Sequence, residues 1–103
     1  MTKVEVARTP LSRMRGLLGR DALPAGQALL IAPCRAIHTL GMRFPIDVRF
    51  YDRRGKLVRQ TLGVKPGRLW VWGGWRARSV LESGAGDPAF ANCNDLKEMG
   101  VTP

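Results

Sequence analysis

The stretch C-R-A-I-H-T-L-G-M-R-F-P-I-D-V-R-F-Y-D, residues 34–52, contains the clearest structural signal in this chain. From residue 46 to residue 51 it alternates between apolar residues and polar or aromatic ones. Because successive side chains of a strand point to opposite faces, this alternation predicts a β-strand over 46–51. The residues that follow, 52–55, end in glycine and predict a hairpin turn to a return strand over 57–64.

The flanking sequence predicts further short strands and little helix. Residues 2–8 alternate like a half-exposed strand, and Thr9-Pro10 begins a predicted short helix over 10–18. The tail from Asp87 is polar and rich in turn residues, which predicts one short helix and a frayed end. Other predicted strands cover residues 28–31, 35–40, 69–72 and 79–83.

The spacing of these elements indicates the fold class. Short strands separated by turns at intervals of roughly eight to twelve residues are typical of a β-sandwich or small barrel. A chain of 103 residues with no long linker is expected to form a single domain over 1–103.

The composition is strongly basic, with 17 Lys and Arg residues against 8 Asp and Glu and a net charge of +9. Such a charge favours anionic partners. Thirteen of the basic residues are arginines, spread from Arg8 to Arg78, so a solvated basic surface is the favoured interpretation. The N-terminus lacks a signal-peptide pattern, and no apolar run approaches a membrane span. We therefore expect a cytoplasmic protein in which Cys34 and Cys93 are reduced thiols.

His38 is the only histidine and the sharpest candidate for a functional side chain. An imidazole transfers protons near neutral pH, binds metals, or joins a buried hydrogen-bond network. Together with Arg43 and Asp47, His38 predicts a cleft for a small anionic ligand. Further residues expected at the same cleft are Met42, Arg13 and Glu82.

The two carboxylates of this set have two interpretations each. Asp47 lies on the strand face opposite the apolar residues, and if that face is covered the carboxylate needs a cationic partner. Arg43, Arg13 and Arg20 are the cations that the sequence offers. A structural ion pair is the favoured role for Asp47, and Glu82 is interpreted in the same way, with a site role second.

Cys34, His38 and Met42 recur every four residues and match the ligand types of a copper site. In a straight strand, residues four apart lie about 13 Å from one another, and in a helix Cys34 and Met42 are about 12 Å apart. The three share one ion only if the chain folds back near Pro33 or Gly41. We therefore expect core packing for Cys34 and Met42, and no metal or other cofactor.

The segment R-L-W-V-W-G-G-W-R-A-R, residues 68–78, interleaves three tryptophans with three arginines. Bases stack on exposed indoles, and guanidinium groups bind phosphates. This segment predicts an alternative function, a site for single-stranded nucleic acid. Inward packing of the aromatic rings is the favoured interpretation. The residues of this alternative site are Trp70, Trp72, Trp75, Arg76 and Arg78.

An enzyme is the other alternative. The sequence has no nucleophile-elbow motif, no phosphate-binding glycine loop and no paired-cysteine zinc spacing, and one histidine cannot supply a histidine-rich centre. A hydrolase-like enzyme would use His38 as a general acid–base, oriented by Asp47.

Three blocks of sequence carry a resemblance to a known family. The first is Thr9 with R-x-R-G-L-L-G-R at residues 13–20. The second is I-H-T-L-G-M-R-F-P-I-D-V-R-F at residues 37–50, followed by Asp52 and Gly55. The third is V-L-E at residues 80–82 with G-A-G at residues 84–86. In this order they cover most of residues 7–86 and resemble a prokaryotic family called domain of unknown function 192.

The resemblance implies a mainly β, jelly-roll-like fold with one or two short helices and no demonstrated catalytic activity. The chain departs from the family pattern after Gly86, where relatives usually carry a helix and a Gly-Asp turn. Residues 87–103 therefore form a divergent tail. We expect a β-sandwich or jelly-roll-like barrel that serves as a non-enzymatic ligand-binding or accessory module.

Overall fold

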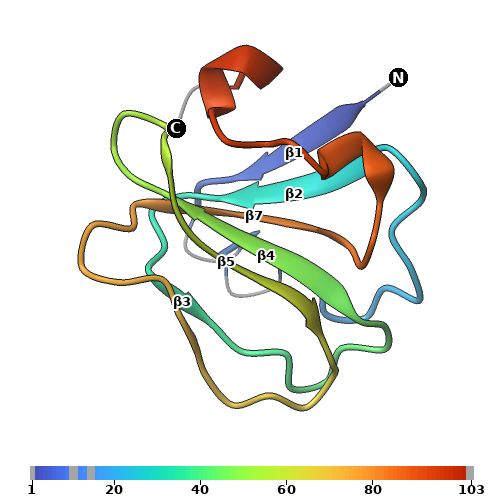
Figure 1. Ribbon diagram of the computed structural model, residues 1–103. Helices are drawn as coiled ribbons and strands as arrows, with labels where there is room; N and C mark the ends of the chain where they lie inside the picture. Colours follow the sequence, from blue (N-terminus) through green and yellow to red (C-terminus); the bar gives the residue numbers. More distant parts are fainter. Residues whose placement is uncertain (1, 10–11, 14–15, 102–103) are drawn as a thin grey trace.

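The computed structural model describes residues 2–9, 12–13 and 16–101. Its main element is an open five-stranded sheet with the order β1-β2-β7-β4-β5 (Figure 1). Strand β1 runs parallel to β2, and the other neighbouring pairs are antiparallel, so the sheet is mixed. The strands are β1 Lys3–Ala7, β2 Gln27–Ile31, β4 Ile46–Tyr51, β5 Leu57–Val64 and β7 Ser79–Gly84.

A second, two-stranded sheet lies over one face of the large one. It pairs β3, Ala36–Ile37, with β6, Val71–Trp72, in antiparallel register. Ile37 and Val71 belong to the same buried cluster as Val48 and Phe50 of the large sheet. The first core therefore sits between the two sheets.

The C-terminal segment covers the opposite face of the large sheet (Figure 1). It contains two short 3-10 helices, η1 at Pro88–Phe90 and η2 at Leu96–Met99. Phe90 and Leu96 are completely buried against Tyr51, whose hydroxyl donates a hydrogen bond to the Cys93 carbonyl at 2.6 Å. The tail thus contains two short helices where one was predicted, and its apolar side chains form a second core. The predicted frayed end, residues 102–103, lies outside the described residues.

The mainly β prediction is confirmed, including the hairpin of β4 and β5 and the strand over 79–83. Two predicted strands are shorter than expected: residues 35–40 contribute only β3, and residues 69–72 only β6. After β3 the chain turns, and Gly41 adopts a φ of 76°. Across the described residues the strands do not close into a barrel, since β1 and β5 remain the edges of the large sheet.

The predicted helix over 10–18 is described only in part, because residues 10, 11, 14 and 15 lie outside the described residues. Ser12 and Arg13 are helical, whereas 16–19 form a turn. Gly16 adopts a φ of 48°, in the left-handed region that ends a helix, so the predicted continuation to residue 18 is wrong. Within the described ranges, no helix is long and apolar enough to cross a membrane.

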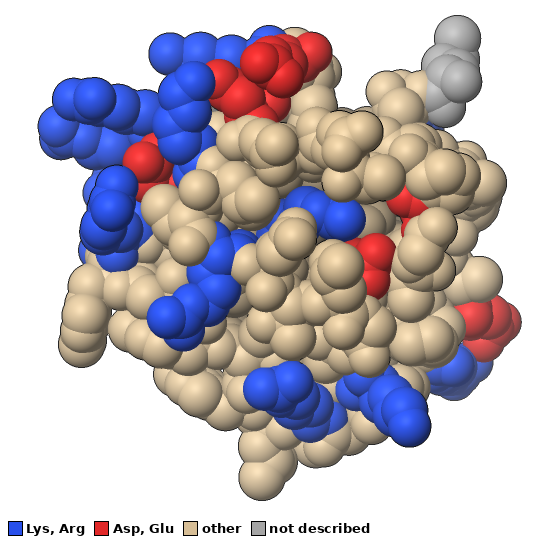
Figure 2. Space-filling view, in the orientation of Figure 1, with Lys and Arg blue, Asp and Glu red and all other residues tan. Residues whose placement is uncertain are grey.

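On the face that Figure 2 shows, many of the basic side chains lie together on one side. Figure 2 shows Lys and Arg gathered on the side of the molecule where the β4–β5 and β6–β7 loops lie in Figure 1. The fold thus brings together arginines that are far apart in the sequence.

Candidate functional site

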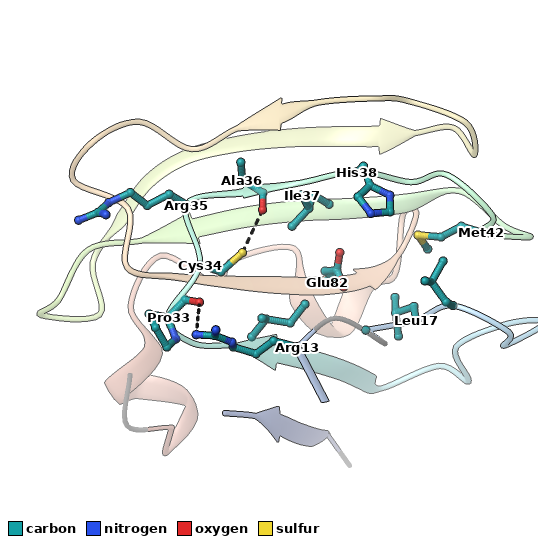
Figure 3. A pocket seen from close by; sticks show the side chains of 13 residues that line it. Arg13, Leu17, Pro33, Cys34, Arg35, Ala36, Ile37, His38, Met42 and Glu82 are labelled. Carbon is teal, nitrogen blue, oxygen red and sulfur yellow. Dashed lines mark hydrogen bonds between the residues drawn. The ribbon is translucent and has the colours of Figure 1, made fainter. Parts of the chain in front are cut away.

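A pocket of about 360 Å³ opens between β2 and β7 on one side and the segment that contains β3 on the other (Figure 3). Residues 16–18 of the turn form part of its wall. The polar residues that line the pocket are Arg13, Cys34, Arg35, His38 and Glu82. The main apolar residues are Leu17, Ile31, Ile37 and Met42.

Glu82 forms the floor of the pocket. It lies on the central strand β7, between Leu29 and Val48 of the neighbouring strands, and points toward the segment that carries Ile37 and His38 (Figure 3). Only 3% of the residue is exposed, and no described residue donates a hydrogen bond to its carboxyl group. Burial among apolar neighbours raises the pKa of Glu82 to about 7.

His38 lies at the opposite side of the pocket and is exposed to solvent. Its Nδ1 accepts a hydrogen bond from the backbone N–H of Leu40 at 3.3 Å. In the neutral imidazole the proton therefore resides on Nε2, which is left as a donor. Met42, which is buried, adds an apolar surface beside the ring.

Arg13 and Cys34 complete the polar lining at the end of the pocket near Pro33. An Nη1–H of Arg13 donates to the Pro33 carbonyl at 3.4 Å, and the Cys34 thiol donates to the Ala36 carbonyl at 3.1 Å (Figure 3). Burial raises the pKa of the Cys34 thiol, which disfavours the reactive thiolate.

The structure brings four of the predicted cleft residues to this pocket and leaves two outside it. Arg13, His38, Met42 and Glu82 line the pocket, whereas Arg43 and Asp47 do not. The exposed guanidinium of Arg43 instead forms a salt bridge with Asp21 at 2.7 Å.

Asp47 is separated from His38 because alternate residues of β4 face opposite sides of the sheet. Its carboxylate accepts hydrogen bonds from the backbone N–H groups of Gly63, at 2.8 Å, and Gly86, at 3.0 Å. The nearest cation is Arg49 of the same strand, at 4.0 Å. Of the cations that the sequence offered as partners, none pairs with Asp47: Arg43 pairs with Asp21, Arg20 pairs with Glu5, and Arg13 donates to a carbonyl. The predicted Asp47–His38 pair is therefore wrong.

The trio Cys34, His38 and Met42 shares one pocket, because the chain turns near Gly41. Among the described residues, this pocket included, no group of three or more His, Cys, Asp or Glu side chains is placed to hold a metal ion.

The tryptophans of the segment 68–78 lie on the surface, which contradicts the favoured interpretation of inward packing. Trp70 is 62% exposed and Trp75 is 81% exposed, while Trp72 lies between them half-buried. The Trp70 and Trp72 rings are stacked with centroids 6.3 Å apart, and Trp75 meets Trp72 edge-on at 5.1 Å. Arg76 and Arg78 line a separate hollow beside Trp75.

Sequence reasoning missed three arginines that lie beside these groups. Arg35 lines both the pocket and the hollow next to Trp75, and Arg53 and Arg54 line the hollow from the β4–β5 turn. The adjacent basic pair in a predicted hairpin turn was the available signal, since it placed two charges on an exposed loop tip.

The fold and the pocket together define a small mixed-sheet domain with a ligand-sized cavity beside its central strand. The chain belongs to the domain of unknown function 192 family (DUF192), described as "Uncharacterized ACR, COG1430", whose model matches residues 1–94. The predicted family resemblance is thereby confirmed.

Two solved structures are similar to this chain. One is a protein of unknown function from Novosphingobium aromaticivorans DSM 12444, with a TM-score of 0.75 and 19% identity over 82% of this chain. This chain spans 64% of that protein's length, less than two thirds. The other, from Sinorhizobium meliloti 1021, is described as a proposed transcription regulator and has a TM-score of 0.77 and 21% identity. It covers 99% of this chain, which spans 77% of it. No curated protein matches the chain.

Proposed function

We propose that this chain is a non-catalytic module that binds a small ligand in the pocket between Glu82 and His38. The carboxyl of Glu82 carries the proposal, because it is buried, has no donor among the described residues, and faces a cavity of about 360 Å³. A ligand with a suitable donor would give this carboxyl the hydrogen-bond partner that no described residue supplies. Pockets of this size, mostly apolar with a few convergent polar groups, are typical of small-molecule sites.

The lining suits a ligand with three parts. An amine or hydroxyl group would donate to Glu82 at the floor, and an apolar middle would contact Leu17 and Ile37. An anionic end would bind the guanidinium of Arg13 and the Nε2–H of His38. This arrangement keeps the expected anionic ligand and the expected residues His38, Arg13 and Glu82, but not Arg43 and Asp47.

The test is a titration followed by protein NMR with three probes of similar length. γ-Aminobutyrate has both end groups, 1,4-diaminobutane has only amines, and succinate has only carboxylates. We expect γ-aminobutyrate to shift the amide signals of pocket residues most strongly. Glu82→Gln should weaken its binding about tenfold or more, the loss typical of a charge-assisted hydrogen bond.

The matched control compares two arginines that the sequence placed at the same cleft. Arg13→Ala should weaken binding, whereas Arg43→Ala should leave it unchanged, because Arg43 lies outside the pocket. Equal binding by all of these variants, or no shift of pocket signals by any probe, would contradict the proposal.

The enzymatic alternative has one observation in its favour. Two titratable side chains, Glu82 and His38, open onto the same pocket, and burial raises the pKa of Glu82 to about 7, a value suited to proton transfer at neutral pH. Hydrolysis of p-nitrophenyl acetate or bis(p-nitrophenyl) phosphate tests it. Turnover that is lost in both His38→Ala and Glu82→Gln, but kept in Arg43→Ala, would replace the binding module by an enzyme.

A further inference from the structure

A second concave site lies away from the ligand pocket floor, at the end of the sheet where three loops meet. This arginine hollow has a volume of about 480 Å³ and is lined by Arg35, Arg53, Arg54, Arg76, Arg78 and Trp75. Asp52 is the one carboxylate in its lining. An adjoining hollow of about 410 Å³ shares Arg35 and Arg78 with it, and another of about 380 Å³ shares Arg53 and Arg78. The basic surface is therefore continuous.

The arginines of the hollow are not neutralised by the protein itself. Arg76 makes a long ion pair with Asp52 at 3.8 Å, and the Nε–H of Arg35 donates to the Trp75 carbonyl at 3.2 Å. Within the described residues, no carboxylate lies at ion-pair distance from Arg53, Arg54 or Arg78. Like charges held together in this way attract anions, and the planar guanidinium group matches the geometry of phosphate.

The aromatic row begins where the hollow ends. Trp75 belongs to the hollow lining, is 81% exposed and meets Trp72 edge-on. Trp72 then stacks on Trp70, which is 62% exposed. The carbonyl of Trp72 accepts a hydrogen bond from Arg59. Exposed aromatic rings of this kind offer flat faces on which bases stack.

Phosphate-binding groups next to base-stacking groups match the chemistry of one class of partner. A single strand presents phosphates and unstacked bases side by side, whereas a duplex hides the base faces. We propose that the arginine hollow and the row of Trp70, Trp72 and Trp75 bind single-stranded nucleic acid, with phosphates in the hollow and bases on the indoles. The site is independent of the Glu82 pocket floor.

The experiment follows tryptophan fluorescence during titration of the full chain with thymidine and uridine oligonucleotides of about 10 nucleotides, a length suited to such sites. At low salt we expect quenching by at least one of the two. The affinity should fall steeply between about 50 and 200 mM salt, as counterion release requires. Comparison of the two oligonucleotides shows whether DNA or RNA is preferred.

Variants separate the two halves of the site. Trp75→Ala should lower the affinity about five- to a hundredfold, the range given by base–aromatic stacking. The double variant Arg53→Ala/Arg54→Ala should reduce the slope of log affinity against log salt by about 0.7 per lost phosphate contact. Both changes are at exposed positions, so circular dichroism should report an unchanged fold.

Arg43→Ala and Glu82→Gln are the matched controls, since one removes an exposed arginine elsewhere and the other alters only the ligand pocket. Both should bind the oligonucleotide like the unmodified chain. The proposal is overturned by absence of quenching at low salt, or by equal losses in Arg43→Ala and the double variant. It is also overturned by equal binding of duplex, or of vesicles rich in phosphatidylserine, because a general anion-binding surface would then suffice.

Discussion

At the scale of single residues, Glu82 is a carboxyl group whose pKa burial changes strongly. Its pKa rises from 4.5 to about 7 because burial disfavours the carboxylate. The folded protein therefore holds a proton on Glu82 more tightly than the unfolded chain does. Stability from this group is fully present below pH 4.5 and is lost as the pH rises to about 7.

Replacing Glu82 by glutamine should remove this pH dependence. The difference in unfolding free energy between Glu82→Gln and the unmodified chain should grow between pH 4.5 and 7 and then stay constant, reaching about 3 kcal/mol in favour of the variant. Chemical denaturation at a series of pH values measures it. Glu98→Gln, at an exposed position, is the control and should show a flat difference. Parallel curves for Glu82→Gln and the unmodified chain would show that the carboxyl is not destabilised by burial.

The residue types predicted which side chains line the pocket better than they predicted which partners those side chains contact. His38, Met42, Arg13 and Glu82 were candidates from sequence, and all four line it. The predicted contact of Asp47 with His38 was wrong, because the sequence could not show that two backbone N–H groups lie beside the Asp47 carboxylate. Asp47 thus has a structural role, as favoured, but through backbone N–H groups instead of the expected ion pair with Arg43, Arg13 or Arg20.

At the scale of elements, the alternating sequence predicted strand β4 correctly. It did not predict that both faces of β4 are buried. Ile46, Val48 and Phe50 face the first core as expected. Asp47, Arg49 and Tyr51 are also buried, and each side chain makes at least one hydrogen bond. The C-terminal segment covers Tyr51. A polar residue in an alternating strand predicts a face that needs partners, and does not by itself predict exposure to solvent.

The loop after β6 depends on a glycine that leaves room for a core side chain. A Cβ atom at Gly73 would lie 2.3 Å from the Phe50 ring, so Gly73→Ala should destabilise the protein by about 1–3 kcal/mol. Gly84→Ala is the matched control, since its Cβ would make only an ordinary contact with the Leu23 carbonyl oxygen at 3.7 Å. Thermal and chemical denaturation of both variants measure the difference. Equal stabilities would mean that the Phe50 ring moves aside at no cost.

At the scale of the whole molecule, the charge distribution could not be predicted because it depends on the topology. The sequence spreads its arginines from Arg8 to Arg78, which favoured a diffuse basic surface. The fold places Arg35, the β4–β5 turn and the β6–β7 loop around one hollow. Sequence clustering is therefore a poor guide to surface clustering in a sheet whose sequence-distant loops meet at one end.

The second core predicts that the fold depends on the divergent tail that follows residue 86. In a chain that ends at residue 86, Tyr51 and Leu81 would lose Phe90 and Leu96, which bury that face of the sheet. Each large side chain removed from the core costs about 2–5 kcal/mol, and a domain has only about 5–15 kcal/mol of stability in total. We therefore expect the truncated chain to lose cooperative unfolding and the dispersed NMR spectrum of a folded protein. The double variant Lys97→Ala/Glu98→Ala, at exposed positions of η2, should remain within about 0.5 kcal/mol of the unmodified chain. A truncated chain that still unfolds cooperatively would show that the first core alone sustains the fold and that the tail only covers it.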